Sequence, residues 1–359
     1  MNTFSSLESP LEIEILDQLA RVAGLASEWG RLFARCRIRT PFQSPEWLLA
    51  WIETFSPSNL RVVVVRNHDR LLGVAPLLIY PRDAERLLAF AGGGVSDYLD
   101  VLSERGQESA VVAAVFSAIL EDPGWTRLEL TDVAPNSVLL RSVALRQLAS
   151  THDNTSVLAL PSELGELLQC FSKRQRANLR NARSRLERSG GGSVERATPD
   201  TMPEFLEDLF RLHTRRWSDK GEPGVLDDHR LRAFHRMATP GLMASGRLHL
   251  YRLRVAVGTA AVMYCLFDAN TVYCYLQGFD PGFAFFSPGT LLMSSLMEDA
   301  IACGMRSFDF LRGQEAYKQH WRAESRSTYR LCLARDHLRS LSNAAKYEVA
   351  ETKASTGNP

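Results

Sequence analysis

The chain has 359 residues, which is long for one ordinary small domain and predicts two domains. A hydrophobic fraction of 45% and a charged fraction of 23% are typical of a globular protein, and a net charge of +1 gives no global reason to expect nucleic acid or membrane as a partner. The six cysteines have neither CxxC spacing nor a histidine cluster beside them, so we expect no metal, no disulfide framework and a reducing, cytoplasmic location.

The segment 1–20 carries acids where a signal peptide needs a basic start and an apolar run. The longest apolar run, 110–120, is much shorter than the ~20 residues that cross a bilayer. We therefore expect neither a signal peptide nor a membrane span.

The first half of the chain, 1–160, predicts a compact α+β domain. Ser44 and Pro45 are suited to capping and starting a helix after a helical entry segment. Pro76 lies inside a predicted strand and indicates an edge or a bulge. The expected elements are helical 11–37, strands 61–66 and 71–80 as a hairpin, a helix over 107–121, a strand over 126–130, a helix over 136–149 and a strand over 156–160.

The second half, 161–336, opens with a basic helix over 172–189 that Ser172 can cap and a glycine run ends. An apolar stripe around Leu179 faces inward, and four cations fall within about 80° of each other on the adjoining face. These cations are Lys173, Arg176, Arg180 and Arg183. A solvated amphipathic helix and a groove wall for a polyanion, such as coenzyme A, a phosphorylated sugar or tRNA, explain this pattern equally well.

The remainder of this half alternates helices and strands, and 337–359 is expected to be a helical and disordered tail. The expected elements are helices over 203–218 and 227–243, strands over 247–257, 259–267 and 272–279, a helix from 287 to about 303, a strand up to Leu311 and a last strand over 327–334.

The most specific unit of the sequence is the last strand–helix–strand run. Its helix starts with Ser287-Pro288-Gly289-Thr290, and free backbone N–H groups at such a start suit a phosphate or pyrophosphate, although proline there is also an ordinary capping device. The strand that follows leads into a cluster of polar and aromatic side chains. They are Glu315, Tyr317, Lys318, His320 and Trp321.

At these residues the sequence resembles a known family. The run 287–321 looks like the C-terminal signature of CelD-type (cellulose-biosynthesis-associated) acyltransferases of the GNAT superfamily. TPFQSPEWLLAWIETF at 40–55 and GGGVSDYLDVL at 92–102 look like its N-terminal landmarks, and 172–188 looks like its central basic helix. The chain is similar, more distantly, to the Fem-like peptidyltransferases.

The resemblance implies two tandem GNAT-like domains with mixed central sheets flanked by helices. The first, 1–160, is expected to be degenerate, and the second, 161–336, to be catalytic. It also implies acyl transfer from acyl-CoA, acetyl or longer, by direct attack of an amine or possibly a hydroxyl of a small-molecule, sugar or peptide acceptor. The usual GNAT pyrophosphate loop, Gln/Arg-x-x-Gly-x-Gly/Ala, is not matched by 283–290.

We predict roles for individual side chains on this basis. Glu315 is the first candidate for general base and Asp309 the second, Tyr317 would protonate the thiolate, and Lys318 would contact a phosphate or the oxyanion. The predicted cofactor-binding residues are Ser287, Pro288, Gly289, Thr290, Gln277, Gly278 and Arg312. The predicted acceptor-binding residues are Asp97, Tyr98, Arg176, Arg180 and Trp217. An Asp309–Arg312 ion pair is an alternative to a chemical role, and His320 and Trp321 are secondary to the others.

Two alternatives stay open. One is a Fem-like aminoacyl-tRNA-dependent transferase in which the basic helix holds tRNA, and the other is a non-catalytic GNAT-like binding protein in polysaccharide synthesis. No nucleophile elbow, HExxH motif or dinucleotide-binding glycine fingerprint supports a covalent hydrolase, a zinc enzyme or a Rossmann enzyme.

Overall fold

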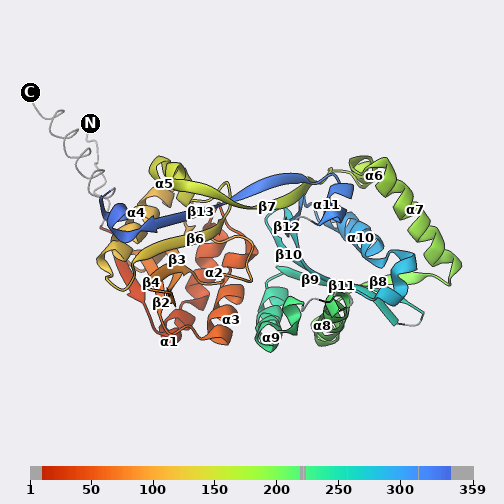
Figure 1. Ribbon diagram of the computed structural model, residues 1–359, viewed down its shortest axis with the longest axis horizontal. Helices are drawn as coiled ribbons and strands as arrows, with labels where there is room; N and C mark the ends of the chain where they lie inside the picture. Colours follow the sequence, from red (N-terminus) through yellow and green to blue (C-terminus); the bar gives the residue numbers. More distant parts are fainter. Residues whose placement is uncertain (1–9, 219–220, 222–223, 257, 314, 341–359) are drawn as a thin grey trace, which may run out of the picture. The chain divides into compact units, whose positions relative to one another are not determined.

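The structure is a computed structural model that describes residues 10–218, 221, 224–256, 258–313 and 315–340. By their contacts these residues form two compact units (Figure 1). Unit 1 contains the described residues up to 152 together with those from 328 onward, and unit 2 contains those within 153–327. The chain therefore leaves unit 1 once and returns to it at its end.

Unit 1 is built on a mixed sheet in the order β1-β2-β3-β4-β6-β13, with β5 paired to β3. All registered pairs are antiparallel except β4 with β6. The strands are β1 (Glu12–Leu16), β2 (Leu60–Asn67), β3 (Arg70–Arg82), β4 (Glu85–Phe90), β5 (Leu102–Ser103), β6 (Arg127–Val133) and β13 (Glu324–Ala334). The helices are α1 (Leu19–Gly24), α2 (Ala26–Arg35), α3 (Pro45–Phe55), α4 (Glu108–Glu121) and α5 (Val143–Leu148).

The core of unit 1 follows from its sequence pattern. The β-branched run 62–65 of β2 is buried on both faces, as expected for a strand covered on both sides. Ser44 caps α3 by accepting from the Trp47 backbone N–H, and the Trp47 side chain is buried and donates to Ser96 Oγ at 3.0 Å. Trp47 therefore belongs to the core of unit 1.

Unit 2 contains the remaining strands of the sheet in the order β7-β12-β11-β10-β9-β8, in which only the β11–β12 pair is parallel. The strands are β7 (Ala149–Ala159), β8 (Gly192–Arg196), β9 (Leu248–Val255), β10 (Gly258–Asp268), β11 (Thr271–Phe279) and β12 (Ser307–Arg312). The helices are α6 (Leu167–Cys170), α7 (Lys173–Arg188), α8 (Met202–Ser218), α9 (His229–Ala244), α10 (Pro288–Ala302) and α11 (Ala316–His320). Short 3₁₀ turns precede α3, α5, α6, α9 and α10.

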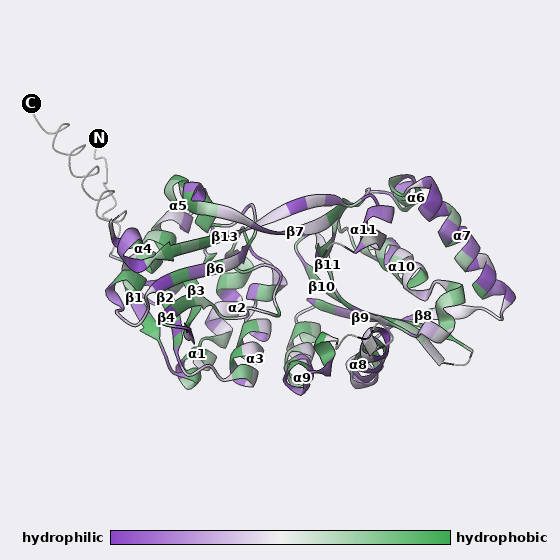
Figure 2. Cartoon of the chain, viewed as in Figure 1, coloured by the Kyte–Doolittle hydropathy of each residue, from purple (hydrophilic) through white to green (hydrophobic). Residues whose placement is uncertain are grey.

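The helices of unit 2 form a layer on each face of its sheet. Figure 1 shows α8 and α9 on one face and α10 on the other, with α7 outside α10. Figure 2 shows that α7 is largely hydrophilic, and its few buried positions are Gln175, Leu179 and Ala182. The predicted α+β class with mixed sheets flanked by helices is thus confirmed.

Several sequence expectations differ from the structure. Residues 12–16 form strand β1 on the edge of the unit 1 sheet instead of part of a helix, and β4 and β8 were not predicted. Pro76 lies in β3, which pairs with β2 on one side and with β4 and β5 on the other. On that second side it falls between the residues that pair with β5 and the residues that pair with β4. The gap between these partners accommodates a residue without an N–H.

The last strand also differs in its place. It was assigned to the second domain, 161–336, but β13 has its registered partners in β6 of unit 1, from Tyr329 onward. Most of the predicted tail, 341–359, lies outside the described residues. None of the helices within the described ranges is both long and apolar enough to cross a membrane.

Candidate active site

A pocket of about 290 Å³ lies in unit 2 at the N-terminal end of α10. Its wall takes in Ser287, Pro288, Gly289 and Thr290, which all belong to the helix start that the sequence singled out. The other described residues that line it are Gln175, Arg216, Gln277, Phe279, Ala284, Met293, Tyr317, His320 and Trp321. We call this cavity the α10 pocket. Segments far apart in the sequence, from α7, α8, β11 and α11, therefore meet at one helix terminus.

The start of α10 is open toward this pocket. Ser287 has left-handed backbone angles, φ 51° and ψ 54°, and its side chain makes no capping hydrogen bond. Pro288 lacks an N–H, and a Cβ built on Gly289 would meet nothing within 4 Å. The backbone N–H of Ser287 donates to Ala284 O at 2.9 Å and that of Thr290 to Ser287 O at 3.0 Å. The partial positive charge at the N-terminus of a helix this long (Pro288–Ala302) and the remaining N–H, that of Gly289, favour an anion.

Arg216, on α8, brings a full positive charge to the same pocket. Its Nε is buried without a hydrogen-bond partner, and its guanidinium lies 4.9 Å from the centre of the Phe279 ring. Burial lowers the pKa of Arg216, while the nearby Tyr317 and Glu315 act in the opposite direction. A half-buried guanidinium with an unsatisfied donor is costly unless a ligand supplies the acceptor.

Tyr317, on α11, is a neutral acid in the pocket. Burial raises its pKa, with smaller contributions in the same direction from Cys274 and Glu315. Gln277 Nε2 donates a hydrogen bond of 2.8 Å to the phenol oxygen, so the phenol proton is not used in this contact. Gln277 and Tyr317, both predicted to be site residues, therefore lie in the same pocket and form a donor–acceptor pair.

Lys318 has a different environment from the one predicted. Its side chain is 3% exposed, and Nζ donates to the carbonyl oxygens of Leu311, Arg312 and Gly313 at 3.0, 2.7 and 3.1 Å. Nζ also lies 2.9 Å from Glu315 Oε2. An ammonium has three N–H donors, so this one is fully used within the loop. It lies outside the pocket lining, and so does Glu315.

The same loop explains Asp309. Its Oδ1 accepts the Leu311 backbone N–H at 2.8 Å, and Leu311 has a left-handed φ of 60°. The β12–β7 register shifts between Asp309 and Arg312, so the strand ends in a bulge. Asp309 and Lys318 hold this bulge from its two sides, and neither lines the α10 pocket.

The other predicted residues serve packing or lie elsewhere. A Cβ on Gly278 would approach the His213 backbone N to 2.8 Å, so this glycine lets β11 pack closely against α8. Arg176 donates to the carbonyl of Phe171 at 3.0 Å, and Arg180 is exposed. Neither arginine, nor Arg312 or Trp217, lines the pocket, and Asp97 and Tyr98 are buried residues of unit 1.

Arg216 and Gln175 were not predicted to bind ligand. Arg216 stands in the run His213-Thr214-Arg215-Arg216-Trp217, where two adjacent arginines give no sign of which one faces a cavity. The structure separates them, because Arg215 is half exposed and pairs with Asp280 at 2.8 Å. Arg215 and Arg216 differ only in the direction in which their side chains leave α8 relative to the sheet on which the helix packs.

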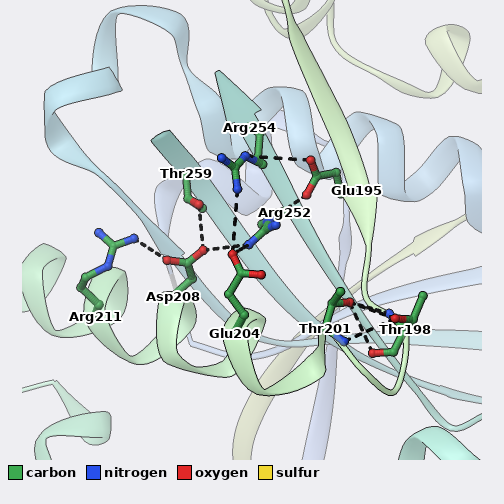
Figure 3. Close-up of polar contacts among 9 residues, drawn as sticks. All are labelled: Glu195, Thr198, Thr201, Glu204, Asp208, Arg211, Arg252, Arg254 and Thr259. Carbon is green, nitrogen blue, oxygen red and sulfur yellow. Dashed lines mark hydrogen bonds and ion pairs between the residues drawn. The ribbon is translucent and has the colours of Figure 1, made fainter. Parts of the chain in front are cut away.

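The opposite end of α8 is fixed by a cluster around Arg252 of β9, shown in Figure 3. Its guanidinium lies 2.7 Å from Glu195, 2.6 Å from Glu204 and 3.3 Å from Asp208, and it stacks 4.2 Å from the centre of the Phe205 ring. Because Glu204, Asp208 and Phe205 all belong to α8, this cluster positions the helix that carries Arg216.

Among the described residues, no group of three or more His, Cys, Asp or Glu side chains could hold a metal ion. The titratable side chains that line the α10 pocket are Arg216, Tyr317 and His320.

Comparisons with known proteins agree with this geometry. Residues 173–319 match the family described as "Acetyltransferase (GNAT) domain", a range that contains every residue lining the α10 pocket except His320 and Trp321. No match was found among curated proteins.

Solved structures show the same fold at low identity. The structure described as FemX aligns with a TM-score of 0.64 at 13% identity, covering 88% of this chain and 98% of that one. The C-terminal domain of a putative lysylphosphatidylglycerol synthetase from Agrobacterium fabrum gives 0.55 at 12%, covering 91% and 97%. L-PGS from Bacillus licheniformis gives 0.51 at 14%, covering 81% and 92%.

The narrower resemblance to CelD-type proteins stays a resemblance, whereas the prediction of a GNAT-type enzyme is confirmed. Residues 173–319, within unit 2, match a GNAT-type acetyltransferase domain, and this match supports a transferase.

Proposed function

We propose that the α10 pocket binds an acyl-CoA thioester and that the protein transfers its acyl group to an amine. The observation that carries this proposal is the unsatisfied Arg216 Nε beside the uncapped start of α10, with the neutral acid Tyr317 in the same wall.

The donor set suits the pyrophosphate and thioester of coenzyme A. Backbone N–H groups at a helix start and a guanidinium are the groups that bind phosphate oxygens. Phe279, Met293 and Trp321 supply apolar wall for the uncharged arm of the donor. The pyrophosphate-loop motif is unmatched, so in this proposal the Gly289 N–H, the partial charge of the α10 start and Arg216 take the place of that loop.

The chemistry is direct aminolysis. The amine nitrogen attacks the thioester carbonyl, a C–N bond forms, the C–S bond breaks, and one proton goes to the leaving sulfur while another leaves the amine. The phenol of Tyr317 is protonated and has its proton unshared, so it supplies the sulfur. His320 lines the pocket and is placed to receive the amine proton. Glu315 is the alternative base, and it would first have to leave its pair with Lys318.

In this proposal Lys318 and Asp309 are positioning residues. They fix the bulge between β12 and α11, and α11 carries Tyr317 and His320. Their substitution should disturb the geometry of the acid and base without removing a group that touches the donor.

The test is release of free thiol from acyl-CoAs of increasing chain length in the presence of small and peptidic amines. Tyr317→Phe removes only the phenol and is expected to lower kcat by about 100-fold or more with little change in KM. Phe283→Leu, a change outside the pocket lining, is the control for a nonspecific effect on the region. Turnover by Tyr317→Phe at the wild-type rate would remove the phenol from the mechanism.

Two further variants separate the candidate bases. Loss of the ascending limb of the pH profile of kcat/KM in His320→Gln, with the limb kept in Glu315→Gln, supports His320. The reverse result restores Glu315 as the base. Wild-type rates in Glu315→Gln, Lys318→Ala and His320→Gln together would show that the chemistry lies elsewhere.

A second donor is favoured by one observation, the exposed cations of α7. Lys173, Arg174 and Arg180 are exposed on the helix that borders the pocket through Gln175. These charges suit an aminoacyl-tRNA in place of acyl-CoA. Affinity for tRNA that falls steeply with salt, and falls again in Lys173→Ala/Arg180→Ala, would support this donor. A flat salt dependence would exclude it.

A further inference from the structure

A second cavity, of about 510 Å³, lies within unit 1. Three arginines line it: Arg37 after α2, Arg141 at the end of a 3₁₀ turn, and Arg146 in α5. We call it the arginine pocket. The GNAT match begins at residue 173, so none of these residues belongs to the matched domain, and the site is independent of the function proposed above.

The charge in the arginine pocket is uncompensated. No Asp or Glu is among the described residues that line it, and Arg37, Arg141 and Arg146 form no ion pair in the part of the chain that the structure describes. Elsewhere in unit 1 arginines do find carboxylates, for example Arg61 with Asp122 at 2.7 Å. All three arginines are exposed, so water screens their mutual repulsion, and an anion bound beside them would find no competing carboxylate in the lining.

The wall between the arginines is held in place from inside the unit. Asp100, 5% exposed, accepts the backbone N–H groups of Val101 and Val138, each at 2.8 Å. Ser137, which lines the pocket, is 1% exposed and accepts the Leu139 N–H at 3.0 Å. The turn that leads to Arg141 is therefore fixed by buried polar contacts, and the cavity lies between this turn, α5 and the residues that follow α2.

We propose that the arginine pocket binds a phosphorylated small molecule with an apolar portion. A phosphate monoester carries about −1.5 to −2 charge at pH 7, and the planar guanidinium fork matches its oxygens. Ile38, Leu140 and Val143 give the cavity an apolar wall, and Val143 is 72% exposed without a ligand. The phosphate of such a ligand would neutralise the three arginines, and its apolar portion would cover Val143.

The experiment is arginine footprinting of the full-length protein with phenylglyoxal, read by mass spectrometry at each arginine. Inorganic pyrophosphate is the probe, and citrate at matched ionic strength is the comparison anion. We expect pyrophosphate to slow modification of Arg37, Arg141 and Arg146 at least threefold in a saturable way. Arg105, exposed in unit 1 and outside the pocket lining, serves as the internal control and should be unaffected.

A titration of pyrophosphate into variants completes the test. Arg141→Ala/Arg146→Ala should lose the protection of Arg37 and weaken binding about tenfold or more, whereas Arg105→Ala should leave it unchanged. Protection that does not saturate at millimolar pyrophosphate, equal protection by citrate, or protection of Arg37 that survives the double substitution would overturn the proposal. Protection of Arg216 in the same data reports on the α10 pocket, so the two sites fail or succeed separately.

Discussion

The two ends of α8 place arginines in opposite environments. At the first end, Arg252 of β9 is 6% exposed and contacts three carboxylates, two of them from α8 itself. At the second end, Arg216 is half-buried and leaves Nε without an acceptor. The first arrangement is complete within the described residues, whereas in the second one N–H donor has no acceptor. We infer from this difference that Arg252 holds the fold and propose that Arg216 binds the substrate.

The comparison predicts the largest effect on activity from Arg216. Arg216→Ala should lower kcat/KM for acyl-CoA by about 100-fold, because a charge-assisted bond to a phosphate oxygen is lost. The free energy of unfolding should change by about 1 kcal/mol or less, since the contact with the Phe279 ring is lost but no ion pair is broken. Thiol release and urea unfolding measure the two quantities. Arg236→Ala, which breaks an exposed pair with Glu207, is the matched control for charge.

Arg252 should show the inverse pattern. Arg252→Ala removes the shared partner of Glu195, Glu204 and Asp208 and is expected to lower the free energy of unfolding by about 2 kcal/mol. The value is below that of a fully buried pair because Glu204 is 58% exposed. The folded fraction should keep its KM for acyl-CoA. A large rise in KM without loss of stability would contradict the assignment of a structural role to Arg252 and a binding role to Arg216 at the two ends of α8.

Lys318 tests whether a side chain whose N–H donors are all bonded within the fold also takes part in the reaction. Lys318→Met should destabilise the protein by about 1–2 kcal/mol, because three carbonyl oxygens lose their donor. Activity should fall through kcat, with KM for acyl-CoA nearly unchanged, since Lys318 does not line the pocket. A rise in KM comparable to that of Arg216→Ala would restore the predicted phosphate contact.

A smaller effect is expected from His213, which lies at the Arg216 end of α8. Burial and then the charge of Arg216 lower its pKa to about 4. Below pH 6.5 the unfolded chain takes up a proton that the folded chain does not, so stability is lost as the pH falls from about 6.5 toward 4. We expect a loss of about 1 kcal/mol between pH 7 and pH 5 by urea unfolding. His213→Gln should lose less over the same interval, and an equal loss would assign the effect to other groups.

The sequence by itself determined the elements and the chemical class of the site. Pro288 and the run of apolar residues behind it gave α10, Ser172 gave the start of α7, and Ser44 with Pro45 gave α3, since capping and periodicity are local properties. The run from Ser287 to Trp321 also indicated acyl transfer, and four residues at the start of α10 with Gln277 and Tyr317 do meet in one pocket.

Only the tertiary structure decided which polar groups face that pocket. Glu315 and Lys318 satisfy each other and the bulge after β12, so their proximity in sequence reflects a structural contact. Arg216 is separated from Tyr317 by about a hundred residues, and no local pattern distinguishes it from Arg215. The return of β13 to unit 1 was equally hidden, because strand pairing depends on long-range register and burial, which a single sequence does not specify.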